Sequence, residues 1–143
     1  MYTISNIVSL KKVDYCVWHV IFQMDHHPLE YATDFLYLLK ENKWVINSLV
    51  THELTSLMLG HSCIYCGETK IACFVTSHEF KLVKQGIIKN NQFRNQVAKE
   101  IDKQPDEISI DVLVVNNKTK WEELASENRF YGNLQRIKNR QKE

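Results

Sequence analysis

The strictest constraint on the fold of this chain is an alternating apolar segment at residues 13–24. A period of two in hydrophobicity is typical of a β-strand. Both of its faces are mainly apolar, so we expect a central strand that is covered on each side. β-Branched residues also occur at positions 2–10, and Lys11-Lys12 provides a turn, which predicts an N-terminal hairpin. The two faces of the strand are Cys16, Trp18, Val20, Phe22 and Met24, and Val13, Tyr15, Val17, His19 and Ile21.

Two segments that follow carry the spacing of amphipathic helices. Pro28 suits a first helical position, and apolar residues then recur at helical spacing up to Leu39, which predicts a helix over residues 28–39. The apolar residues between Trp44 and Leu59 predict a second helix that ends at Gly60. The Val45-Ile46 start of this segment leaves a strand as an alternative.

The second half of the chain alternates short strands and helices. We expect two strands, 63–66 and 70–76, joined at Gly67, and a break at Gly86. A helix capped by Asn90 or Asn91 must end by Pro105, because proline restricts the residue before it. Strict alternation predicts a strand over residues 107–115. A capping box at 119–122 then opens a helix over about residues 119–140, with inward side chains at Trp121, Leu124, Tyr131, Leu134 and Ile137.

This order of elements predicts the fold class. A chain of 143 residues, of which 44% are hydrophobic, suits one domain with one core. Strands and helices are mixed without a regular βαβ alternation. We therefore expect a single α+β domain over residues 1–143, with a mostly antiparallel sheet of about five strands packed by three to four helices.

The cysteines at 63, 66 and 73 allow two interpretations. In a CxxC turn followed by glycine, Cys63 and Cys66 converge, and Cys73 with His61 would complete a tetrahedral zinc site. His78 or Cys16 are alternative fourth ligands. In a hairpin, Cys63 and Cys73 instead share one face and Cys66 takes the other, so that the thiols are core residues. Because a second CxxC is absent, we favour the core interpretation without a cofactor, and structural zinc is the alternative.

Another candidate site is Asp25-His26-His27, at the end of the first long strand. An aspartate beside histidine can orient a general base or bind a metal. With an acidic group such as Glu53 nearby, these residues would serve a small metal-dependent hydrolase or nuclease. Polar residues also cap helices, and we favour that role here. His52-Glu53 lacks the second histidine of a zinc-protease helix.

The last candidate is a basic C-terminal arm, formed by Arg129, Arg136, Lys138, Arg140 and Lys142. Basic residues complement the negative end of a helix dipole, and they also fit phosphates or an acidic partner. The overall net charge of +1 gives no general attraction to nucleic acid or to a membrane.

Exclusions narrow the function further. The chain has no phosphate-binding glycine loop, no dinucleotide fingerprint and no nucleophile elbow. No secretory signal is visible at residues 1–10, so we expect reduced thiols and a cytoplasmic protein. We expect a small non-catalytic binding or regulatory protein that acts through protein–protein contacts, a class common in phages and mobile elements. The alternatives are a zinc-stabilised nucleic-acid-binding module and the metal-dependent hydrolase or nuclease.

Overall fold

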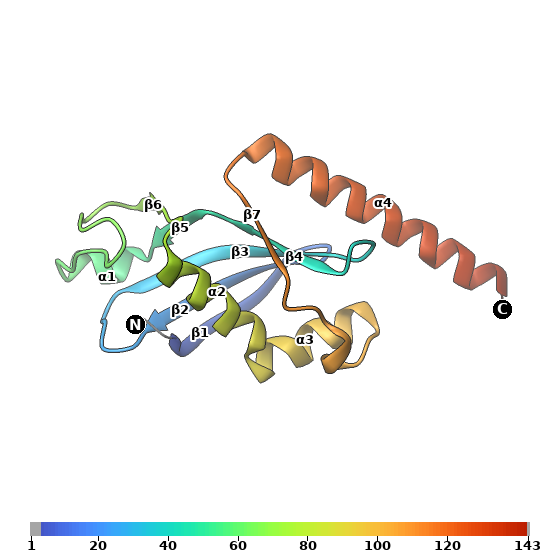
Figure 1. The fold of residues 1–143 in the computed structure, drawn as a ribbon, viewed down its shortest axis with the longest axis horizontal. Helices are drawn as coiled ribbons and strands as arrows, with labels where there is room; N and C mark the ends of the chain where they lie inside the picture. The colour runs from blue at the N-terminus through green and yellow to red at the C-terminus, as the bar shows by residue number, and fades with distance from the viewer. Residues whose placement is uncertain (1–3, 143) are drawn as a thin grey trace.

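The computed structural model describes residues 4–142, without the side chains of residues 4, 5, 139, 141 and 142. The α+β prediction is confirmed, although the sheet has seven strands and not about five (Figure 1). Its strands are β1 Ile4–Asp14, β2 Val17–Met24, β3 Glu30–Leu38, β4 Lys43–Asn47, β5 Leu49–His52, β6 Ala72–Phe74 and β7 Val112–Val115. The helices are α1 Leu54–Met58, α2 His78–Lys89, α3 Asn91–Ile101 and α4 Lys118–Lys142, with a short 3-10 turn at Pro105–Glu107.

The sheet is antiparallel except at one edge. Its main path runs β1-β2-β3-β4-β7, and β7 lies parallel to β4. β3 pairs with β4 through its last residues and with β5 through Tyr31 and Ala32. β6 then pairs with β5. Thr33 lies on β3, opposite the junction of β4 and β5. Its hydroxyl donates to the carbonyls of Asn47, which ends β4, and Leu49, which begins β5, and so holds both strands to β3.

The N-terminal hairpin forms as predicted, but its turn is not at Lys11-Lys12. Those lysines belong to β1, and the chain reverses at Tyr15 and Cys16. The Asp14 carboxylate accepts a hydrogen bond from the Tyr15 N–H, and Cys16 adopts a left-handed conformation with φ 56°. The predicted Tyr2 and Thr3 part of this strand lies outside the described residues.

The helix predicted over residues 28–39 is wrong, and the one predicted over residues 44–59 is confined to the short α1 near its end. Residues 30–38 form β3, and the segment 44–59 divides into β4, β5 and the short α1. β3 is buried at nearly every position, because it lies inside the sheet with packing on both faces. Such a strand shows no alternation, and its apolar residues then fit a helical spacing equally well. The alternative of a strand at Val45-Ile46 is confirmed by β4.

The helices α2 and α3 cover one face of the sheet. α2 was not predicted, because Gly86, in its third turn, indicates a break. The Ser77 side chain caps the start of α2 by accepting from the N–H of Phe80. α3 is capped by Asn90 and ends before Pro105, as predicted. A buried cluster of rings in edge-to-face contact lies between this layer and the sheet. Phe93 comes from α3, and Trp18, Phe35 and Trp44 come from the strands.

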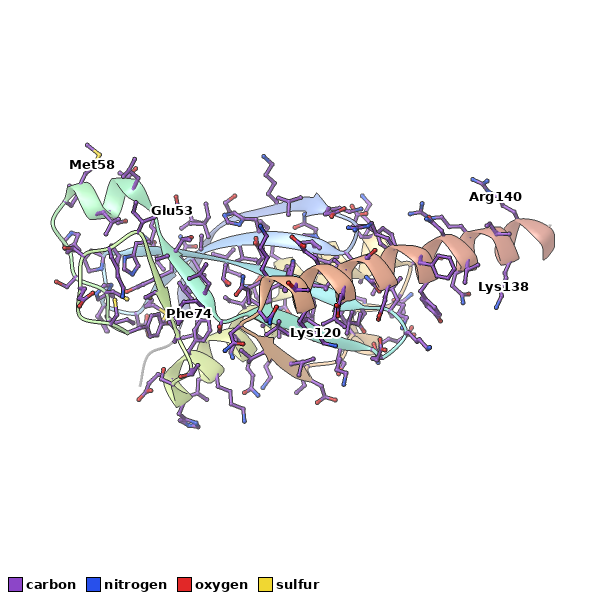
Figure 2. All side chains as sticks on the ribbon, turned by 90° about the horizontal axis from the view of Figure 1, so that it is seen from above. Glu53, Met58, Phe74, Lys120, Lys138 and Arg140 are labelled. Carbon is purple, nitrogen blue, oxygen red and sulfur yellow. The ribbon has the colours of Figure 1, made fainter. Side chains whose placement is uncertain are left out.

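The opposite face of the sheet is only partly covered, by α4. The second face of β2 is therefore half-buried, and His19 there bonds Asp34 at a Nδ1–Oδ1 distance of 2.8 Å. Asn128 anchors α4: its amide accepts from the Leu39 N–H and donates to the Tyr37 carbonyl. Beyond this point α4 extends past the sheet (Figures 1 and 2). Leu134 and Ile137 are consequently 40% and 51% exposed, contrary to the prediction, whereas Trp121, Leu124 and Tyr131 are half-buried.

Three further elements differ from expectation. The cysteine-bearing segment 63–66 is a turn and not a strand. The strand predicted over 107–115 is confined to β7: Glu107 ends the 3-10 turn, and residues 108–111 form a bend and a loop. Asn117, and not Thr119, caps α4, with its side chain accepting from the Lys120 N–H. In the part of the chain that the structure describes, no helix combines the length and hydrophobicity that crossing a bilayer requires.

Candidate metal centre

The CxxC segment forms a knuckle that turns both thiols to the same side. The Gly67 N–H bonds the Cys63 carbonyl at 2.8 Å, and the Cys63 N–H bonds the carbonyl of Glu68 at 3.1 Å. Gly67 has φ 72°, a conformation that glycine adopts without steric cost. The Tyr65 N–H then points at Cys63 Sγ, 3.3 Å away. The CxxCG segment therefore forms the turn that the alternative zinc interpretation requires, with Cys63 and Cys66 on the same side.

The strand pair β5–β6 supplies the other two side chains. Cys73 on β6 lies opposite Val50 on β5, and His52 follows two residues after Val50. Alternate residues of a strand share a face, so His52 is the diagonal neighbour of Cys73. Both side chains are buried, with exposed fractions of 3% for His52 and 2% for Cys73. The sheet thereby positions one imidazole and one thiol beneath the knuckle.

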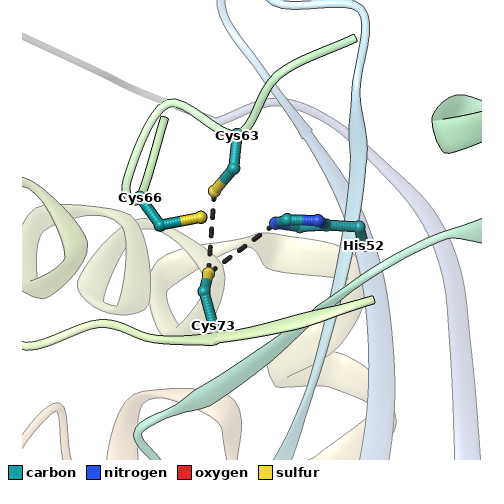
Figure 3. A group of neighbouring side chains, drawn as sticks. All are labelled: His52, Cys63, Cys66 and Cys73. Carbon is teal, nitrogen blue, oxygen red and sulfur yellow. Dashed lines mark hydrogen bonds between the residues drawn. The ribbon is translucent and has the colours of Figure 1, made fainter. Parts of the chain in front are cut away.

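The four side chains converge on one point, as Figure 3 shows. The ligand atoms of His52, Cys63, Cys66 and Cys73 all lie within 4.8 Å of one another. Cys63 Sγ and Cys73 Sγ are 3.6 Å apart, and Cys73 Sγ is 3.7 Å from His52 Nε2. Around a tetrahedral zinc, bond lengths of ~2.3 Å to sulfur and ~2.0 Å to nitrogen place sulfurs about 3.8 Å apart, and sulfur and nitrogen about 3.5 Å apart. The two distances in the cluster lie within about 0.2 Å of these edges.

Electrostatics favour a thiolate at this site. The thiol of Cys73, which donates to Cys63 Sγ, and the backbone N–H groups of Cys66 and Tyr65 hold the pKa of Cys63 well below its usual range, although burial opposes this shift. The shared proton stays on Cys73, whose pKa is raised by the hydrogen bond to Cys63 and by burial. A divalent cation would replace that proton, since metal ligands bind as thiolates.

Tyr31 fastens the knuckle to the sheet. Its hydroxyl accepts from the Ile64 N–H at 3.2 Å and contacts His27 Nδ1 at 3.3 Å. Its ring packs edge-to-face against both His52 and Tyr65. Burial raises the pKa of Tyr31 above its ordinary value, so the hydroxyl stays neutral. β3 thus orients both the knuckle backbone and the imidazole, which is how surrounding groups fix metal ligands.

The structure brings the three candidate cysteine ligands together, and the fourth member of the cluster is His52 and not His61. His61 lies in the loop before the knuckle, and His78 is exposed at the first turn of α2. Cys16 is buried at the β1–β2 turn, against Asn128 and Tyr15. None of these three alternatives joins the group of potential metal ligands.

The candidate hydrolytic residues are not assembled into a site. Asp25 and His26 are exposed in the β2–β3 turn, where His26 has φ 57°. His27 turns toward Tyr31 and accepts from the Leu29 N–H, so it supports the knuckle. Glu53 is half-buried after β5, where its N–H bonds the Glu30 carbonyl. Among the described residues, the only group of three or more potential metal ligands is the cysteine–histidine cluster.

The basic arm is divided between internal contacts and solvent. Arg129 forms an ion pair with Asp14 at 2.8 Å, and the Arg136 guanidinium lies over the Tyr15 ring. Lys138 and Arg140 are exposed on the extended end of α4, on opposite sides of the helix (Figure 2). α4 includes Lys142, whose side chain is not described.

Comparisons with protein-family models, with curated proteins and with solved structures find no match for this chain. Three thiols and one imidazole form a set of soft and borderline ligands that suits zinc and not magnesium or calcium. Sequence reasoning missed His52 because it placed that residue on a helix. The sequence signal that could have identified His52 is the pair of apolar segments around Val50 and Cys73, had both been interpreted as antiparallel strands.

Proposed function

We propose that the protein is a non-catalytic module that binds protein partners and is stabilised by a structural zinc ion. The observation that carries the zinc assignment is the convergence of His52, Cys63, Cys66 and Cys73 within 4.8 Å. Four protein ligands fill a tetrahedral shell, which leaves no position for a reactive water. Catalytic zinc sites keep such a position open, so this geometry supports a structural role.

The place of the cluster supports the same role. Residues 53–71 contain one short helix and the knuckle, and none of the strands of the sheet. A zinc ion would join the knuckle to β5 and β6, and so add to the hydrogen bonds through Tyr31, Ser56 and Tyr65 that hold this long connection to the sheet. Binding to the folded state alone adds stability in proportion to the logarithm of the zinc concentration over its dissociation constant.

Protein partners are favoured over nucleic acid because the basic arm is partly engaged. Arg129 and Arg136 are occupied by Asp14 and Tyr15, which leaves Lys138 and Arg140 as exposed cations of the arm with described side chains. Nucleic-acid binding draws on many phosphate contacts and weakens steeply with salt. The exposed apolar side chains of α1 and β6 fit a protein surface better, and they include Met58 and Phe74 (Figure 2).

Metal content and cobalt substitution test the zinc site. We expect one zinc per chain by elemental analysis, and visible absorption typical of tetrahedral thiolate ligation after exchange to Co²⁺. Cys63→Ala should abolish that absorption. Cys16→Ala is the matched control, since it removes a buried thiol outside the cluster. A strong chelator should lower the melting temperature of the wild type and of Cys16→Ala.

The site would be refuted by a wild-type protein that binds neither Zn²⁺ nor Co²⁺. It would also be refuted if His61→Ala lost the metal while His52→Ala kept it. Circular dichroism of each variant separates a lost ligand from a lost fold, because an unfolded variant loses its strand and helix signal as well.

A further inference from the structure

A groove between α2 and β7 lies on the same side of the molecule as the two-helix layer. Figure 1 places α2 beside β7. The groove has a volume of about 930 Å³, within the range of natural ligand sites. One wall is the apolar segment 110–114, and the other is the first two turns of α2. Its charged lining consists of Lys43, His78, Lys81, Lys84, Glu41 and Asp111.

The strand that forms this wall has an open edge. β7 pairs with β4 on one side only. The Asp111 carbonyl accepts from the Trp44 N–H and the Val115 carbonyl from the Ser48 N–H, so the odd-numbered residues of β7 are those that bond to β4. The residues between them, Val112 and Val114, therefore direct their N–H and C=O groups away from β4. Among the described residues these groups have no backbone partner, so β7 can accept one more strand.

The opposite wall carries a buried lysine without an acidic partner. Lys84 is only 4% exposed, and its ammonium lies 4.7 Å from the centre of the Phe80 ring. None of the described carboxylates forms an ion pair with it. Burial, and then the neighbouring Lys81, lower the pKa of Lys84 to about 8. A buried cation of this kind is costly unless an anion joins it.

We propose that the groove between α2 and β7 binds an extended acidic peptide of a protein partner, which adds a strand to the edge of β7 and places a carboxylate on Lys84. This inference rests on the proposed binding function and names the partner's chemistry. Main-chain hydrogen bonds to Val112 and Val114 would provide affinity. The carboxylate on Lys84, and the apolar side chains along β7, would provide selectivity.

A peptide fits this groove better than a nucleotide. The lining offers no aromatic ring besides His78 on which a base could stack, and no glycine-rich turn that would approach a phosphate. The side chains of Ile110, Leu113 and Val114 are exposed instead, and they can contact the apolar side chains of an extended peptide paired beside β7. The cations of the groove then complement an acidic sequence.

A display library of random linear peptides tests the proposal on the zinc-loaded protein. We expect enrichment of β-prone sequences that carry Asp or Glu. Amide NMR should show the selected peptide shifting residues 112–114 and the start of α2, with slower hydrogen exchange at Val112 and Val114. Lys84→Met should weaken binding by about tenfold or more, the size of a lost charge-assisted hydrogen bond. Lys89→Met is the control, on the same helix but outside the groove.

Backbone N-methylation of the selected peptide supplies a test that leaves the protein unchanged. Methylation at the positions facing Val112 and Val114 should abolish binding, because it removes the donors of the added strand. Val114→Pro should act in the same way from the protein side, since that N–H faces outward and proline is tolerated on edge strands.

Several results would overturn the proposal. These are an absence of enriched peptides, equal binding to the wild type and Lys84→Met, or NMR shifts confined to another surface. Inorganic phosphate that shifts only α2 and leaves β7 unchanged would identify a simple anion site instead. If the sample contains zinc but selects no peptide, only the groove assignment fails. If it selects acidic peptides on β7 without zinc, only the metal assignment fails.

Discussion

Replacing Lys84 by methionine should stabilise the free protein. Methionine is one atom shorter than lysine and keeps its unbranched apolar stem, but it removes the buried charge that lies over the Phe80 ring. Buried ionised groups without a partner are destabilising, and apolar replacements of similar volume are often neutral or stabilising. The same change that should weaken peptide binding is therefore expected to raise the free energy of unfolding.

The magnitude follows from the pKa of Lys84. Burial in the groove, and then Lys81, lower it from the ordinary 10.5 to about 8. Each pH unit between the two values corresponds to about 1.4 kcal/mol, so the upper limit is about 3.5 kcal/mol. The groove admits water and also contains Glu41 and Asp111, which offset part of the cost. We expect a gain of roughly 1–2 kcal/mol near neutral pH.

The pH dependence has a definite sign. Above pH about 8 the folded wild type releases the Lys84 proton, whereas the unfolded chain keeps it up to about 10.5. The unfolded state then holds more protons, so wild-type stability rises with pH relative to the variant. The advantage of Lys84→Met should be constant below pH about 8 and shrink above it. The other charged groups facing Lys84, namely His78, Lys81, Lys43, Glu41 and Asp111, are the same in both proteins and largely cancel in the difference.

Urea unfolding followed by tryptophan fluorescence, with zinc in excess, measures this difference at each pH. Lys89→Met is again the control, because Lys89 is exposed and should change the stability little. The reasoning fails if Lys84→Met is less stable than the wild type near neutral pH. It fails equally if the difference between the two proteins stays constant up to pH about 10.

Three other substitutions probe the framework around the groove and the metal centre. Asn128→Leu should lower the free energy of unfolding by about 2–4 kcal/mol, because it leaves the Tyr37 carbonyl and the Leu39 N–H unpaired. The control Asn133→Leu changes an exposed residue of the same helix and should have little effect in the same urea-unfolding experiment. Gly86→Ala should raise the unfolding free energy by about 0.5–1 kcal/mol, since Gly86 is exposed inside α2, and a destabilised variant would contradict this. Arg129→Ala should lower the melting temperature only slightly, because its ion pair with Asp14 is exposed and worth at most about 1 kcal/mol.

The parts of the fold that the sequence predicted are those with local signals. Residues 17–24 alternate clearly because one face of β2 is fully buried and the other is mostly half-buried, whereas residues 13–16, predicted as part of the same strand, end β1 and form the turn. The cap at Asn90 and the long C-terminal helix follow from side-chain chemistry within a few residues. β3 and β4 lack such a signal, since packing on both faces removes the alternation. α2 was hidden because tertiary burial of Phe80 and Ile87 outweighs the propensity cost of Gly86.

The candidate metal site was predictable in its local half only. Cys63 and Cys66 lie in one turn, and their spacing alone brings two thiols together. Cys73 and His52 come together through strand pairing, which depends on the register between β5 and β6. A residue placed on the wrong type of element cannot be assigned to the right neighbours, and His52 was lost for that reason. The open edge of β7 depends likewise on topology, which no local pattern in residues 107–115 reveals.

The position of β7 at the end of the sheet has a consequence for synthesis of the chain. β1 to β4 pair with neighbours close in sequence, whereas β7 reaches β4 only after more than sixty intervening residues. Contacts of such separation form late, since the loop must close before they contribute. A nascent chain that has not yet extended through Val115 therefore presents the edge of β4, with Trp44, to other nascent chains. We expect ribosome-stalled or truncated forms ending before β7 to aggregate, and the emergence of the last strand to end that exposure.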